Sequence, residues 1–128
     1  MNRAQMMERA RYIKHRDKQM LLYDFSNLTT EDARQLMDYC PGLIRNMPPQ
    51  SVLTLTDVSG LTFDEQLKEA FKALTQHNKP YVIAGAVVGV TGWKKIVYLA
   101  SLRFAGRNNL QLFDTVAMAK DWLSGYRA

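Results

Sequence analysis

The chain has 128 residues, the length of one globular domain with its own hydrophobic core. Hydrophobic residues make up 47% and charged residues 23%, which excludes a disordered chain, and no apolar run approaches the roughly 20 residues that span a bilayer. The first nine residues are basic but lack the apolar segment of a secretory signal, and the single cysteine, Cys40, cannot form an internal disulfide. We therefore expect one soluble, cytoplasmic domain covering residues 1–128.

The net charge of +5 is unevenly distributed. Residues 1–18 and residues 93–128 each contain six Lys or Arg against two acidic residues, whereas residues 19–92 contain five against eight. The basic residues are scattered, without interleaved aromatic residues or a nucleic-acid-binding motif. This pattern indicates a surface with a positive lobe and no nucleic-acid partner.

The N-terminal part predicts a hairpin. Residues 1–10 form a flexible or helical extension, and residues 11–15 and 20–25 form two strands. Because the turn between them is too short for a crossover, the two strands should be antiparallel.

The first long helix is expected from Thr29, with Asp32 in a variant of the capping box, to the break at Met47-Pro48-Pro49. Pro41 should kink this helix or restart it as a first-turn residue. The apolar residues at helical spacing are Ala33, Leu36, Met37, Cys40 and Ile44.

Residues 52–58 predict the next strand. A capping box at Thr62-Phe63-Asp64-Glu65 then starts a helix that ends at His77-Asn78-Lys79-Pro80. Its apolar stripe consists of Leu67, Ala70, Phe71 and Leu74.

Residues 81–88 form an apolar run without polar alternation, which indicates a strand buried on both faces of a parallel sheet. The residues expected to be central and fully buried are Val82, Ile83, Ala84 and Val87. A helix from Thr91 should follow, with a core stripe of Trp93, Ile96, Val97, Ala100 and Phe104.

The C-terminal part predicts a short strand at 110–113 and a helix capped by Asp114 or Thr115. That helix should continue through Met118, Ala119, Trp122 and Leu123 to Gly125. The fold class is therefore an open α/β sandwich with four helices, whose sheet has four to five mostly parallel strands and an antiparallel N-terminal strand.

Three parts of the chain resemble the STAS superfamily, the SpoIIAA-like fold of anti-sigma-factor antagonists. They are Val52–Val58, the segments Asn78–Val82 and Val88–Ile96, and Leu112–Thr115 with Ala119–Leu123. The nearest branch is similar to both STAS and CRAL-TRIO lipid-transfer domains, and the resemblance runs from about Tyr12 to Leu123. It implies a regulatory or protein-binding role, with lipid carriage as an alternative.

STAS regulators switch by phosphorylation of a serine in an Asp-Ser-Ser-Gly-Leu motif at a helix N-terminus. This chain has Asp57-Val58-Ser59-Gly60-Leu61, in which valine replaces the first serine. Counted from the strand end, the family's phosphorylated position falls near Asp64-Glu65, where no hydroxyl is present. We therefore expect that Ser59 is not a phosphorylation switch.

Asp24 and Asp57 each end a predicted strand, so their carboxylates would meet if the two strands are parallel neighbours. Such a pair could hold Mg²⁺ or accept a phosphoryl group. However, Asp24 is followed by Phe25-Ser26, not by a second acid, and strand-end aspartates commonly form turns with nearby backbone N–H groups. The turn interpretation is favoured.

The remaining chemistry-bearing residues are dispersed. Ser59 lacks a nucleophile elbow, Cys40 lies on an apolar stripe, and His15 and His77 lie on different elements. We expect no catalytic residue, metal or cofactor.

Gly85, Gly89 and Gly92 surround a strand-to-helix turn, and the helix N-terminus with Lys94 and Lys95 would suit an anion. The spacing matches neither the dinucleotide-binding nor the P-loop motif, so a tight turn is the favoured interpretation. Gly89, Thr91 and Gly92 form the candidate anion site.

The helix expected after Thr91 has apolar residues beyond its core stripe: Tyr98, Leu99, Leu102 and Ala105. Either neighbouring elements cover this excess, or it contacts another protein, a second copy of the chain, or a lipid. Lys94 and Lys95 would favour an acidic partner or a lipid headgroup.

We rank a non-catalytic regulatory or protein-interaction domain first. A lipid or small-ligand carrier is second, and a phosphoryl- or metal-dependent enzyme using the strand-end aspartates is third.

Overall fold

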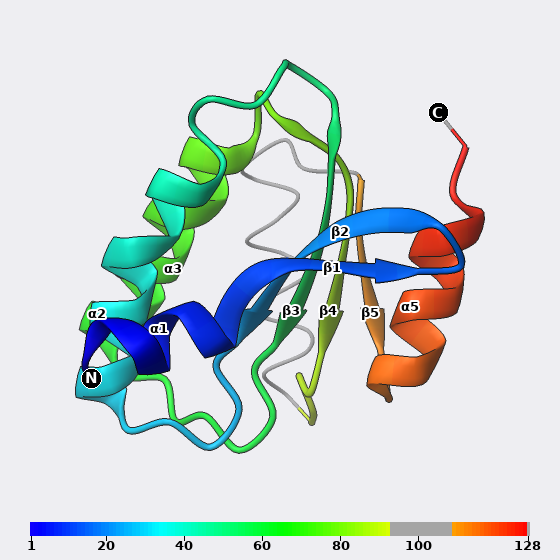
Figure 1. The fold of residues 1–128 in the computed structure, drawn as a ribbon. Helices are drawn as coiled ribbons and strands as arrows, with labels where there is room; N and C mark the ends of the chain where they lie inside the picture. The colour runs from blue at the N-terminus through cyan, green and yellow to red at the C-terminus, as the bar shows by residue number, and fades with distance from the viewer. Residues whose placement is uncertain (93–108, 128) are drawn as a thin grey trace.

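The computed structural model describes residues 1–92 and 109–127, which form a five-stranded sheet in the order β1-β2-β3-β4-β5 (Figure 1). The strands are β1 (Ala10–His15), β2 (Lys18–Asp24), β3 (Val52–Asp57), β4 (Val82–Val88) and β5 (Leu110–Phe113). β1 pairs with β2 in antiparallel fashion, and the other pairs are parallel. The predicted sheet is thereby confirmed. The helix expected after Thr91 lies outside the described residues, apart from its first two positions.

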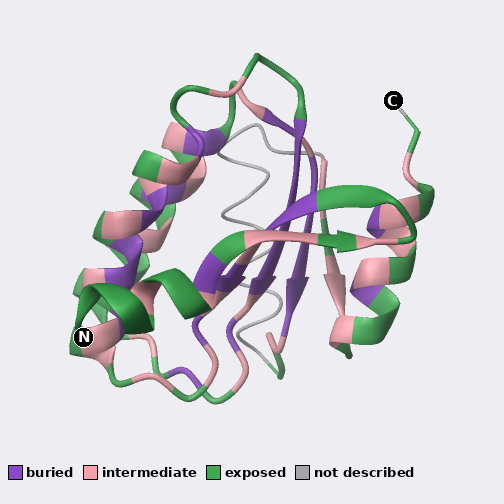
Figure 2. Ribbon diagram, viewed as in Figure 1, coloured by how far each residue is buried: buried purple, intermediate pink, exposed green. Residues whose placement is uncertain are grey.

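Helices lie on both faces of the sheet. α2 (Thr30–Tyr39) and α3 (Glu65–Asn78) cover one face, and α5 (Val116–Gly125) covers the other (Figure 1). Each face has its own buried cluster, one with Tyr23 and Leu36 and the other with Leu55 and Leu123. The inner strands β3 and β4 are largely buried (Figure 2), as the apolar run at 81–88 predicts for β4. No described helix combines the length and apolarity needed to traverse a bilayer.

The N-terminal extension contains a helix, α1 (Arg3–Arg9), which leads directly into β1. The turn between β1 and β2 consists of Arg16 and Asp17, with φ values of 51° and 64°. Two consecutive residues with positive φ are typical of the tight two-residue hairpin turn whose twist matches the strands. The hairpin is therefore as short as predicted.

α2 begins where the sequence indicates, because the Thr29 hydroxyl accepts a hydrogen bond from the Asp32 amide at 3.1 Å. All five residues of its predicted stripe are buried, including Cys40 and Ile44 beyond the helix itself. Pro41 restarts the chain as a 3₁₀ turn, η1 (Cys40–Leu43), so the restart alternative is correct.

The predicted capping box at Thr62 is wrong. α3 begins after Asp64, whose Oδ1 accepts a hydrogen bond from the Leu67 amide at 2.7 Å. A carboxylate is a strong cap and also complements the positive end of the helix dipole, so the start moves by two residues. Within the predicted stripe, Leu67 and Leu74 are buried whereas Ala70 and Phe71 are half-buried.

One other expectation about burial needs correction. Val82, Ala84 and Val87 are buried as predicted, but Ile83 is only half-buried. Ile83 packs against the cluster on the α5 face, where a single described helix covers the sheet. Met118 is 52% exposed, because it lies in the first turn of α5 beside the cap Thr115.

Two buried groups predict how stability depends on pH. Burial raises the pKa of Tyr23 above its ordinary 10.0 and that of the Cys40 thiol above its ordinary 9.0. The unfolded chain therefore releases these protons at lower pH than the folded chain, so their contribution is complete below about pH 9 and is lost as the pH rises. We expect the free energy of unfolding, measured by urea titration, to fall from about pH 9 to pH 11.

The fall should be smaller in Tyr23→Phe and in Cys40→Ala, while Tyr39→Phe, at a half-exposed position, serves as the control. Equal pH profiles for all four proteins would contradict the assignment.

Candidate functional site at the carboxyl edge of the sheet

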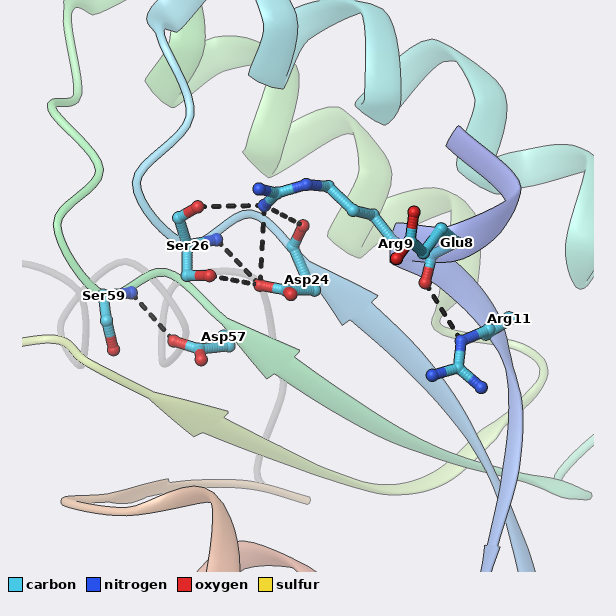
Figure 3. Close-up of polar contacts among 7 residues, drawn as sticks. All are labelled: Glu8, Arg9, Arg11, Asp24, Ser26, Asp57 and Ser59. Carbon is cyan, nitrogen blue, oxygen red and sulfur yellow. Dashed lines mark hydrogen bonds and ion pairs between the residues drawn. The ribbon is translucent and has the colours of Figure 1, made fainter. Parts of the chain in front are cut away.

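The two strand-end aspartates lie next to each other. β2 and β3 are parallel neighbours, and Asp24 pairs with Asp57 in their register. Figure 3 shows both carboxylates at the edge where the parallel strands end, which is where open α/β folds commonly bind ligands. Because β2 and β3 are parallel neighbours, the two carboxylates lie side by side as the sequence allowed. What this pair of carboxylates can do chemically depends on the hydrogen bonds that each one already accepts.

Asp24 closes a turn with Ser26. Its Oδ1 accepts hydrogen bonds from the Ser26 amide at 3.0 Å and from the Ser26 hydroxyl at 2.6 Å. Arg9 Nη1, at the end of α1, lies 3.8 Å from the same oxygen and donates to the Ser26 carbonyl at 2.9 Å. Arg9 therefore clamps the loop after β2. This role of Arg9 is not visible in the sequence, since nothing in the local pattern distinguishes Arg9 from other surface cations.

Asp57 closes an equivalent turn, because its Oδ1 accepts a hydrogen bond from the Ser59 amide at 2.9 Å (Figure 3). Both aspartates thus bond to the backbone two residues ahead, the interpretation that the sequence favoured.

The loops beyond the strands continue the pairing of the sheet. The Phe25 amide donates to the Asp57 carbonyl and the Asn27 amide to the Ser59 carbonyl, both at 2.8 Å. On the other side, the Val58 amide donates to the Val88 carbonyl at 2.9 Å. The loops after β2, β3 and β4 are thereby joined by main-chain hydrogen bonds.

Two glycines permit this close approach. Gly60 has φ +71°, and an added Cβ would meet the Asn27 side chain. Gly89 has φ +94°, and an added Cβ would lie 2.5 Å from the Ser59 amide nitrogen. Gly89 therefore permits the close approach of its loop to the backbone of Ser59. Whether Gly89, Thr91 and Gly92 bind an anion stays a prediction.

The other titratable candidates lie elsewhere. His15 ends β1 beside the start of β2, and its Nε2 lies 3.0 Å from Asp121 Oδ1 of α5. His77 lies at the end of α3, with its Nδ1 3.1 Å from Asn78 Oδ1, and Cys40 is buried between α2 and the sheet. Across residues 1–92 and 109–127, no three His, Cys, Asp or Glu side chains are grouped to hold a metal ion.

The remaining predicted positions lie in or beside the loops at this edge. Ser59 is half-buried in the turn that precedes α3, and Asp64 caps that helix. Whether Ser59 is phosphorylated stays a prediction. Thr91 and Gly92 are exposed, whereas Lys94, Lys95, Tyr98, Leu99 and Leu102 lie outside the described residues.

The variant Gly89→Ala tests whether the loop after β4 lies as close to the Ser59 backbone as the structure shows. We expect it to destabilise the fold by at least about 1 kcal/mol, because alanine is strained at positive φ and its methyl group would push the Ser59 backbone away. Gly125→Ala is the control, since its added Cβ meets nothing within 4 Å at the end of α5, and it should change stability by less than about 0.5 kcal/mol. Equal urea midpoints for the two variants would refute the close approach.

Comparison with known proteins identifies the fold. No protein-family model and no curated protein matches the chain in sequence. One solved structure superposes with a TM-score of 0.70, covering 89% of this chain and 91% of its own, at 16% sequence identity. It is an uncharacterised protein of the DUF3478 family from Shewanella loihica PV-4, described as having a SpoIIAA-like fold. This similarity confirms the predicted SpoIIAA-like fold and, at this level of identity, shows the fold alone.

Proposed function

We propose that this domain is a non-catalytic regulatory module that binds another protein, and that the outer edge of β1 accepts an extended, acidic segment of that partner. The observation that carries the proposal is the combination of unpaired backbone groups and exposed positive charge along β1.

The arrangement of the carboxyl edge supports a role without catalysis. Oδ1 of Asp24 and Oδ1 of Asp57 each hold a turn, and the loops around them are hydrogen-bonded to one another. A metal or phosphoryl site at this edge would need oxygens that point toward a ligand and at least one further convergent group. Because Oδ1 of each carboxylate is engaged in its turn, only Oδ2 of each is left for a ligand, and among the described residues no third His, Cys, Asp or Glu is grouped with them.

The outer edge of β1 has the backbone geometry of a docking strand. In an antiparallel pair, opposed residues alternate between hydrogen-bonded and non-bonded positions, starting here from His15 and Lys18 beside the two-residue turn. Tyr12 and Lys14 are therefore non-bonded positions, whose N–H and C=O groups point away from β2. β1 is the terminal strand of the sheet among the described residues, so these groups face outward.

The open edge begins at Tyr12. The preceding outward-pointing amide, that of Ala10, donates to the Met6 carbonyl at the end of α1. The docking edge is thus short, and a partner strand would pair with Tyr12 and Lys14.

The charge of the hairpin favours an acidic partner over a second copy of the chain. Residues 9–18 contain five Lys or Arg and one acidic residue. Arg11 and Lys14 are exposed, and successive side chains of a strand point to opposite faces, so positive charge borders the edge on both faces. Pairing of β1 with itself would bring like charges together, whereas an acidic strand would neutralise them.

The cavity beneath α3 gives no support to the lipid-carrier alternative. Its volume is about 30 Å³. Pockets for ligands of ordinary size occupy roughly 300–1,000 Å³.

A proline substitution at the edge tests the proposal. The probe is a short peptide in which glutamate alternates with valine, and the readout is amide hydrogen exchange by NMR. The peptide should slow exchange at Tyr12 and Lys14 and leave the Ile13 amide, which bonds to β2, unchanged. Lys14→Pro removes one outward N–H and should weaken peptide binding about tenfold relative to Lys14→Ala, which removes the charge but keeps the N–H.

Unchanged exchange at the Ile13 amide in Lys14→Pro would show that the hairpin is intact. A peptide in which lysine replaces glutamate should not bind, and added salt should weaken the acidic peptide. If the acidic peptide protects neither Tyr12 nor Lys14, or if Lys14→Pro and Lys14→Ala bind it equally, β1 is not the docking edge.

A further inference from the structure

The face of the sheet beneath α3 contains a polar cavity within an otherwise apolar core. Its polar lining side chains are Tyr23, Thr54, Thr56, Thr75 and Asn78. The cavity is partly open and has a volume of about 30 Å³, and every described residue that lines it is uncharged. This volume exceeds the roughly 10–15 Å³ that a cavity needs to hold one water molecule.

The cavity is notable for two hydroxyl groups of β3. Thr54 and Thr56 are 5% and 7% exposed, so both are more than nine-tenths buried. Neither hydroxyl forms a hydrogen bond with any side chain or backbone group of the described residues. A buried hydroxyl without a partner is costly, by roughly 1–3 kcal/mol, and such groups normally have a partner in the protein or in bound solvent.

The neighbouring strand leaves room beside Thr54. Gly85 of β4 is fully buried, and an added Cβ there would lie 2.7 Å from Thr54 Oγ1 and would also meet the Leu110 side chain. Thr54 Oγ1 therefore lies over Gly85 on the face covered by α3. Glycine inside a strand commonly marks such a close approach.

The other polar groups of the cavity are partly engaged. The Tyr23 hydroxyl accepts a hydrogen bond from Asn78 Nδ2 at 3.2 Å, and the Thr75 hydroxyl donates to the Phe71 carbonyl at 2.9 Å. Burial raises the pKa of Tyr23, so its hydroxyl keeps its proton and can donate to a further acceptor. The lining thus offers donors and acceptors but no net charge.

We propose that this cavity is a binding site for an uncharged hydroxyl compound of about the size of water, held by Thr54 and Thr56. An ion is disfavoured, because the described lining contains no opposite charge to replace its hydration. A purely apolar ligand is disfavoured, because it would leave both hydroxyls unpaired. Water and a small alcohol share the required chemistry, and the experiment distinguishes them.

The first measurement is NMR of the full chain with methanol as the added probe. A resident water gives long-lived water cross-peaks to the Thr54 and Thr56 side chains that methanol does not displace. An alcohol site instead gives methanol cross-peaks that saturate on titration. Either result supports the site and identifies its occupant, whereas cross-peaks from neither molecule overturn it.

The second measurement compares isosteric variants by thermal unfolding. If the hydroxyls share one bound molecule, Thr54→Val and Thr56→Val should each lower Tm by about 3–6 °C, and the double variant should lower it by less than the sum. Thr62→Val, in the exposed loop before α3, is the control and should leave Tm nearly unchanged. A rise in Tm for both variants would overturn the site, because valine would then have relieved two unpaired hydroxyls.

Discussion

Main-chain hydrogen bonds between β2, β3 and β4 continue beyond the ends of these strands into the loops that follow them. These hydrogen bonds fix the positions of the loops at the carboxyl edge of the sheet. The amides of Phe25, Asn27 and Val58 extend the parallel ladder into the loops. Asp24 and Asp57 shape those loops by accepting hydrogen bonds from Ser26 and Ser59. In many α/β proteins this edge opens into a ligand-binding crevice, and here the described loops are joined instead. In this SpoIIAA-like fold the loops after β2, β3 and β4 are thus joined by main-chain hydrogen bonds at the carboxyl edge.

The two proposed binding sites are formed by residues other than the strand-end aspartates. The β1 edge combines unpaired backbone groups with positive charge, which suits an acidic partner strand more than a second copy of the chain. The cavity lies beneath α3, and Thr54 and Thr56 of the central strand β3 line it with hydroxyls that have no hydrogen-bond partner among the described residues. Partner binding at β1 and occupancy of the cavity involve different residues, so the two proposals stand or fall separately.

Sequence patterns predicted elements whose signals are local. The spacing of Leu36, Cys40 and Ile44 and the apolar run at 81–88 placed a helix and a buried strand correctly. The helix start was harder to predict, because Thr62 and Asp64 can both cap a helix, and the structure uses Asp64, whose carboxylate accepts a hydrogen bond from the Leu67 amide. The sequence predicts that Asp24 and Asp57 meet only if β2 and β3 are parallel neighbours, and the order of strands in a sheet cannot be predicted from local sequence patterns. The Arg9 clamp and the half-buried Ile83 depend on contacts between distant segments, which a single sequence does not reveal.

The most direct test of the central claim is native-state hydrogen exchange of the loop amides of Phe25, Asn27 and Val58. If the loops are joined as described, these amides should exchange nearly as slowly as the strand amides of β3, because opening them requires breaking the extended ladder. The exposed amide of Gly60, which donates none of these hydrogen bonds, should exchange rapidly and provides the internal reference. If Phe25, Asn27 and Val58 exchange as fast as Gly60, the edge opens in solution, and the account of loops joined along this edge is wrong.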